Sequence, residues 1–132
     1  ASNKKIMILV GRNIYKDDMS LRMNYILNDP SNQDRRPGIL EYNKYSVKFE
    51  NGSTIYIRTL DEDCMRGLSV DETYIDEFDY ISNSVLLKSM PAILSSSLKI
   101  NMFSTKNENN VSGYVEDQIN KNIFNISTYR KV

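Results

Sequence analysis

Two adjacent carboxylates, Asp76 and Glu77, are the side chains of this sequence best placed to do chemistry. They lie near the end of a run rich in β-forming residues, 72–78 (Glu-Thr-Tyr-Ile-Asp-Glu-Phe). A strand buried between helices does not hold paired acids in its middle, so we expect them at its carboxyl end, where open α/β sheets bind ligands. There one acid can hold Mg²⁺ through water while the other takes a proton from an attacking water. Taken alone, the pair also fits solvated acids that cap a strand.

The composition fits one globular domain, or a piece of one. A chain of 132 residues can bury a single core. Its 17 Lys and Arg residues balance its 17 Asp and Glu residues, so the total charge demands no nucleic-acid or anionic-membrane partner. The single Cys64 and the absence of histidine exclude an internal disulfide and a Cys/His metal site. The lone cysteine makes a reducing, intracellular setting the expectation. No apolar run approaches the roughly 18 residues that span a bilayer, so we expect no membrane partner.

The amino-terminal third predicts a buried strand and then a helix. Residues 5–10 form a continuous apolar run, which is typical of a central parallel strand covered on both faces. Asp17 and Asp18 supply helix-capping chemistry for a partly buried helix through about residue 27. The polar segment 28–38 contains two prolines and predicts a surface loop.

The middle of the chain predicts an antiparallel ribbon. Apolar and polar residues alternate over 45–59, and Asn51-Gly52 interrupts them with a signature of a type I′ hairpin turn. An acidic-to-basic loop, 60–68, then leads to the strand that carries the acids.

The carboxyl-terminal part returns to alternating helices and strands. Residues 82–97 predict a helix capped by serines, with Pro91 as a kink or restart, and 99–103 predict a strand. A helix over 111–120 and a last strand over 123–129 follow. The alternation indicates an α/β fold with a mostly parallel sheet, flanked by helices and carrying one antiparallel hairpin.

Arg66 and the Ser104-Thr105 pair belong to the same predicted constellation. Ser104 and Thr105 close the strand that follows the acidic one, so in a doubly wound sheet they face the same crevice as Asp76 and Glu77. Hydroxyls there can sense a γ-phosphate, and an arginine can neutralise charge on transferred phosphoryl oxygens. Two plainer interpretations stay open: Arg66 pairs with the acids of its own loop, and the hydroxyls cap a following turn.

These motifs, in this order, resemble the ATPase domain of viral DNA-packaging terminase large subunits. The likeness is greatest to herpesvirus terminases, with tailed-phage terminases next. It covers residues 5–129 and consists of short motifs in sequence rather than long identity. The motifs are 51–53 (Asn-Gly-Ser), 66–67 (Arg-Gly), 74–78 (Tyr-Ile-Asp-Glu-Phe), 91–94 (Pro-Ala-Ile-Leu), 99–105 (Lys-Ile-Asn-Met-Phe-Ser-Thr) and 123–129 (Ile-Phe-Asn-Ile-Ser-Thr-Tyr).

The resemblance implies a P-loop NTPase fold of the ASCE or RecA-like kind, with ATP and Mg²⁺ as cofactors. Asp76 then belongs to the Walker B motif and holds the Mg²⁺ water shell, and Glu77 activates the hydrolytic water. Ser104 and Thr105 form the motif that couples hydrolysis to movement. Arg66 stands where some members have an arginine finger that acts on a neighbouring subunit's nucleotide.

The resemblance also implies partners and a place of action. Terminase motors hydrolyse ATP to drive double-stranded DNA into a capsid, so the expected partners are that DNA, the portal protein and other terminase subunits in a homo-oligomeric ring. The expected location is the interior of the host cell: the nucleus for a herpesvirus-like protein, the cytoplasm for a phage-like one.

The sequence departs from the family pattern in three places. A Gly-rich Walker A loop ending in Lys-Ser/Thr is absent before residue 5, and Gly11-Arg12-Asn13 lacks the glycine and lysine to replace it. The nuclease domain is also missing, and Lys106 stands where phage members often have proline. We therefore expect residues 1–132 to be a single partial ATPase domain, inactive alone. A helicase-like or other P-loop ATPase and a non-catalytic α/β interaction module remain as alternatives.

Overall fold

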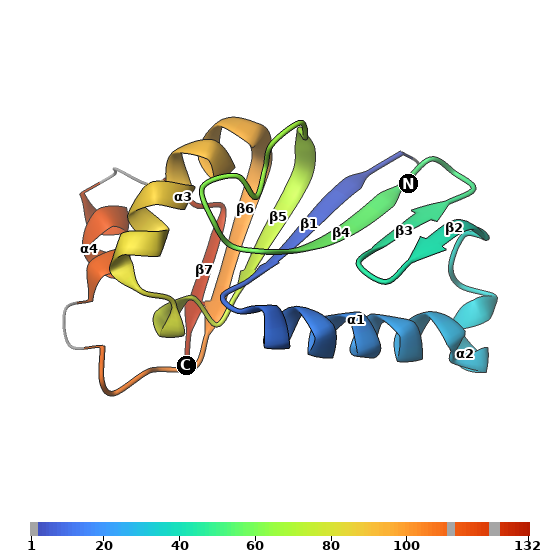
Figure 1. Cartoon of the computed structure of the whole chain (residues 1–132), viewed down its shortest axis with the longest axis horizontal. Coiled ribbons are helices and arrows are strands. Elements are labelled where there is room, and N and C mark those ends of the chain that lie inside the picture. Colours follow the sequence, from blue (N-terminus) through green and yellow to red (C-terminus); the bar gives the residue numbers. More distant parts are fainter. Residues whose placement is uncertain (1–2, 111–112, 122–124) are drawn as a thin grey trace.

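The computed structural model describes residues 3–110, 113–121 and 125–132, with strands and helices alternating along most of the chain (Figure 1). The elements in order are β1 (Lys5–Val10), α1 (Asn13–Asn28), α2 (Pro30–Gln33), β2 (Ile39–Asn43), β3 (Ser46–Phe49), β4 (Thr54–Thr59), β5 (Val70–Asp76), the 3₁₀ helix η1 (Phe78–Tyr80), α3 (Asn83–Ser96), β6 (Ser97–Ser104), α4 (Tyr114–Asn120) and β7 (Thr128–Lys131).

The strands form one mixed sheet in the order β2-β3-β4-β1-β5-β6-β7. β1 pairs in parallel with β4 and β5, and β6 pairs in parallel with β5 and β7. β3 runs antiparallel to both of its neighbours. The sequence-based prediction of a mostly parallel sheet with an antiparallel ribbon is confirmed, and β1 is central as expected.

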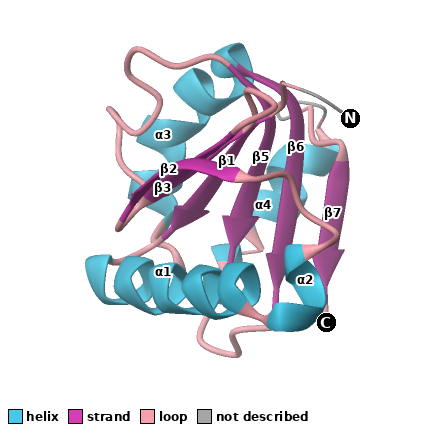
Figure 2. Ribbon diagram, turned by 90° about the vertical axis from the view of Figure 1, so that its right-hand side faces the viewer, coloured by secondary structure: helices cyan, strands magenta, loops and turns pink. Residues whose placement is uncertain are grey.

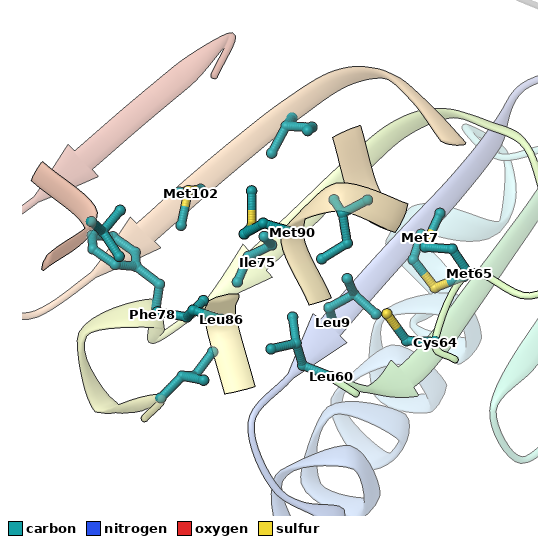
Figure 3. Packing of buried hydrophobic residues seen from close by; sticks show 14 of the residues in the cluster. Met7, Leu9, Leu60, Cys64, Met65, Ile75, Phe78, Leu86, Met90 and Met102 are labelled. Atoms are coloured by element: carbon teal, nitrogen blue, oxygen red, sulfur yellow. The ribbon is translucent and has the colours of Figure 1, made fainter. Parts of the chain in front are cut away.

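Successive side chains of β1 point to opposite faces of the sheet, and a separate apolar cluster lies on each face. Met7 and Leu9 are fully buried in the larger apolar cluster, with side chains from α3 and from residues 60–65 (Figure 3). Ile8 points to the opposite face and packs in a smaller cluster with α1, β3 and β4. Helices thus lie on both sides of the sheet, α1 on one and α3 with α4 on the other (Figures 1 and 2). This covering of both faces explains the uninterrupted apolar character of β1.

The first helix begins earlier than the sequence suggested. α1 starts at Asn13, directly after β1, so the prediction that Asp17 and Asp18 cap it is wrong. Both acids lie inside the helix, where Asp18 pairs with Arg22 one turn later at 3.1 Å. Asp17 instead accepts a hydrogen bond from Tyr45, which ties α1 to the ribbon.

Two elements near the ribbon also differ from expectation. The segment predicted as loop contains the short helix α2 and leads into β2, an edge strand whose residues are mostly exposed and therefore carry no apolar periodicity. The β3–β4 hairpin forms as predicted, but through a four-residue connection, 50–53. Among its residues only Gly52 has a positive φ, at 88°, so the turn is not the type I′ turn predicted for Asn51-Gly52.

The carboxyl-terminal elements follow the prediction with shifted bounds. The Ser82 side chain caps α3, as expected, and the helix continues through Pro91 without a restart. α4 begins at Tyr114, and the first residues predicted for it, 111 and 112, lie outside the described residues. The last strand is Thr128–Lys131 rather than 123–129; residues 123 and 124 of that prediction are also outside the described part.

Candidate functional site

The acids and the hydroxyls meet at the carboxyl edge of the parallel sheet. Asp76 is the last residue of β5 and is aligned with Phe103 of β6, so Ser104 follows one position further along the same edge. Because β1, β5 and β6 are parallel, their carboxyl ends open on the same side. The sequence-based expectation that Asp76, Glu77, Ser104 and Thr105 share one edge therefore agrees with the strand register.

Glu77 makes the sharp turn that leaves β5. Its backbone is left-handed, with φ 51° and ψ 44°, a conformation that costs a non-glycine residue roughly 1–2 kcal/mol. The turn directs the carboxylate toward the end of β6, where Thr105 donates twice. The Thr105 N–H binds Oε1 and its hydroxyl binds Oε2, each at 3.1 Å. Strained backbone of this kind is typical of functional positions, where a side chain must be aimed rather than merely packed.

Asp76 and Glu77 line a crevice between the start of α1 and the end of β5. Two adjoining hollows, of about 430 and 320 Å³, share Gly11, Tyr15, Glu77 and Tyr80. Burial and the neighbouring negative charge of Glu77 together raise the pKa of Asp76 above its ordinary value, although Arg22 on the same crevice opposes the shift. A bound cation would relieve this penalty, because it would stabilise the charged form of the carboxylate.

The carboxylates at this edge suit a metal ion whose other ligands are mostly water and substrate phosphates. In the described ranges, no three His, Cys, Asp or Glu side chains are grouped so that they could hold a metal ion. Mg²⁺ does not require such a cage, since it keeps several waters and is commonly bound through one or two carboxylates plus substrate phosphates. Asp76, partly buried and beside a second acid, fits that minimal role.

The two hydroxyls of the predicted pair have different surroundings. The Ser104 hydroxyl is buried, accepts from the Asp79 N–H at 3.2 Å and donates to the Thr105 carbonyl at 2.7 Å. Only Thr105 therefore contacts Glu77 directly. The hydroxyl bonds run to the Asp79 N–H, the Thr105 carbonyl and Glu77, rather than to the turn at 108–109 that the plainer interpretation would have them cap.

Arg66 is not brought to these acids. It lies in the loop 60–69, which runs from the end of β4 to the amino end of β5, the opposite edge of the sheet from Asp76 (Figure 1). Its guanidinium pairs with Asp63 of the same loop at 2.8 Å, and the side chain is 79% exposed. The plainer interpretation, an ion pair within the loop, is thus realised, and an arginine finger acting within this subunit has no geometric support.

Sequence reasoning missed a buried acid two residues after Glu77. Asp79 is only 3% exposed and forms an ion pair with Lys131 at 3.2 Å. A weak signal was present, because Asp79 stands between apolar residues in a segment otherwise suited to the core. Its partners come from residues far along the chain, which the sequence could not identify.

Comparisons with known proteins support the fold. No known family model matches the sequence. The large terminase of a thermophilic bacteriophage has a similar structure, with a TM-score of 0.58 and 13% identity over 98% of this chain and 33% of that one. This chain therefore spans about a third of the length of that terminase. No helix in the described part of the chain is both long and apolar enough to cross a membrane. The likeness shows a terminase-like α/β fold.

Proposed function

We propose that this chain supplies the Walker B acids and the coupling hydroxyl of an ATPase motor of the viral large-terminase type. Such a motor hydrolyses ATP to drive double-stranded DNA into a capsid. The observation that carries the proposal is the contact between Glu77 and Thr105: a strained glutamate at the end of one parallel strand meets two donors at the end of the next. The terminase-like fold supports it.

In this proposal Glu77 is the general base and Asp76 the metal-shell residue. A carboxylate at this edge can accept a proton from a water aligned with a γ-phosphate. Asp76 would hold Mg²⁺ through water, and the ion, when bound with ATP, neutralises charge on the phosphate oxygens. Thr105 contacts both oxygens of Glu77, so any movement of the end of β6 changes the direction in which Glu77 points.

The remaining parts of the site come from elsewhere in this proposal. Gly11-Arg12-Asn13 follows β1 but lacks the residues of a phosphate loop, so the lysine and backbone nest that cradle phosphates belong to another segment. Arg66, exposed in the loop that leads from β4 to β5, is proposed to act on the nucleotide of a neighbouring subunit in a ring. The portal protein and double-stranded DNA are the proposed partners inside the host cell.

Substitution of the proposed base in the complete protein that contains this chain tests the proposal. Glu77→Gln keeps the size of the side chain and removes its basicity, so ATP turnover should fall by about 10²-fold or more while nucleotide binding is retained. Glu72→Gln, on the same strand but toward its amino end, is the matched control and should turn over normally. Unchanged turnover in Glu77→Gln would contradict the proposal and favour a non-catalytic α/β module.

A further inference from the structure

A buried acid that the proposed chemistry does not use lies directly behind the Glu77–Thr105 contact. Asp79 belongs to η1, two residues after Glu77, and its side chain is 2% exposed. Burying a carboxylate is costly unless its charge is paired and its oxygens accept hydrogen bonds. The hydrogen-bond and ion-pair partners of Asp79 therefore indicate which part of the chain it holds in place.

Those partners come from the last residue of β6, from the segment after it and from β7. The Asp79 N–H donates to the Ser104 hydroxyl at 3.2 Å. Its carboxylate accepts from the Asn107 N–H and the Asn110 side-chain amide, each at 2.7 Å, and pairs with the Lys131 ammonium at 3.2 Å. One acid thus fixes the segment 104–110 at its start, its middle and its end.

Thr105 lies between two of these fixed points. Ser104 precedes it and Asn107 follows two residues later, and both bind Asp79. Its neighbour Lys106 is held as well, since its N–H donates to the Val132 carbonyl at 2.8 Å. With the flanking backbone fixed, the Thr105 N–H and hydroxyl have little freedom except toward the two oxygens of Glu77.

We propose that Asp79 is a positioning residue that, by holding the segment 104–110, aims both donors of Thr105 at the carboxylate of Glu77. Asp79 does not contact Glu77 through its own side chain in any described hydrogen bond. Its effect passes through Ser104 and Asn107 to the backbone of Thr105.

The Lys131 ammonium offsets the cost of burying the Asp79 carboxylate. Its ammonium is 14% exposed and contacts both Asp79 and, at 3.0 Å, Glu116. Burial disfavours the charged lysine, but hydrogen bonds to Glu116 and Asp79 outweigh it, and the pKa of Lys131 is raised. The lysine stays charged at neutral pH, so the Asp79 carboxylate keeps its counterion.

The positioning can be measured in this chain without nucleotide. An amide held in a hydrogen bond exchanges its hydrogen with solvent slowly. The Thr105 amide should therefore be protected from hydrogen exchange, and Glu77→Ala, which removes its acceptor, should abolish that protection. Asp79→Asn should abolish the same protection in a folded protein, whereas Asp63→Asn, at an exposed acid, should leave it unchanged.

Two results would overturn the proposal. A folded Asp79→Asn variant that keeps the wild-type protection of the Thr105 amide shows that Asp79 does not aim Thr105. If Asp79→Asn does not fold, Ser104→Ala is a smaller change that removes the acceptor of the Asp79 N–H. Wild-type protection of the Thr105 amide in Ser104→Ala then contradicts the proposal.

The catalytic consequence rests on the proposed function and has its own readout. In the complete ATPase, Asp79→Asn should lower kcat and leave the KM for ATP unchanged, since it disturbs the base rather than the nucleotide contacts. If the hydrogen-exchange result holds but the wild-type protein has no ATP turnover, the proposed function fails and the positioning stands. If turnover is present and Asp79→Asn keeps full kcat, the catalytic consequence is wrong.

Discussion

Two polar loops near β5, residues 60–69 and 104–110, carry predicted functional residues but are held in different ways. The first is anchored by apolar side chains: Leu60, Cys64 and Met65 are each 3% exposed and face the core against β1 (Figure 3). Its charged residues Asp63 and Arg66 lie in solvent. The second loop has no such apolar anchor in the described residues and is fixed instead by the buried Asp79 and its partners.

The difference matters because the two kinds of contact constrain different things. Apolar burial is non-directional, so it holds the 60–69 loop on the core without fixing where Arg66 points. Hydrogen bonds weaken steeply away from a narrow range of angles, so the Asp79 contacts fix the orientation of the segment that contains Thr105. The 104–110 segment therefore fixes the direction of Thr105, whereas the 60–69 loop leaves the Arg66 side chain exposed with only a surface ion pair.

Removal of the buried charge should have the largest effect. Asp79→Ala leaves the Lys131 ammonium without one of its two partners and removes the carboxylate that accepts from the Asn107 N–H and from the Asn110 side-chain amide. Breaking a buried pair in this way costs about 3–5 kcal/mol of unfolding free energy. Urea denaturation at pH 7 measures it.

The matched control is the acid of the other loop. Asp63→Ala removes an exposed partner of Arg66 and should cost less than about 1 kcal/mol. Similar losses in Asp79→Ala and Asp63→Ala would show that the two loops are not held differently.

Loss of an apolar anchor should come next in size. Met65→Ala removes a buried side chain from the larger core cluster, which typically costs about 2–5 kcal/mol. The loss should be global, since the cluster also holds α3 and β1, and it should leave the hydrogen-exchange protection of the Thr105 amide unchanged in the folded protein. A Met65→Ala variant that loses this protection would mean that the 60–69 loop also supports the Glu77 contact.

The sequence could predict that Asp76, Glu77 and Thr105 share one edge of the sheet, but not the contacts of Asp79 that hold the segment containing Thr105. Asp76 and Glu77 follow an apolar strand, and Thr105 follows the next one, so parallel pairing alone brings them to one side of the sheet. No comparable rule predicts the partners of Asp79. Its partners Asn107 and Lys131 lie 28 and 52 residues further along the chain, and neither a period nor a turn signal connects them.

The missed elements have a similar cause. β2 is an edge strand with little burial, so no alternation marks it. α1 begins without a side-chain cap at Arg12, whereas the capping chemistry of Asp17 and Asp18 predicts a later start. In both cases tertiary packing, rather than local sequence, decides the structure.

The smallest expected effect concerns Arg66. Because its side chain is largely exposed and pairs only with Asp63 among its described ion pairs, the coupling between the two in a double-mutant cycle should be below about 1 kcal/mol. Denaturation of Arg66→Ala, Asp63→Ala and the double variant measures this coupling. A value well above that limit would mean that Arg66 is committed to its own loop. A small value would mean that the exposed guanidinium is not committed to its own loop, as the proposed contact with a neighbouring subunit requires.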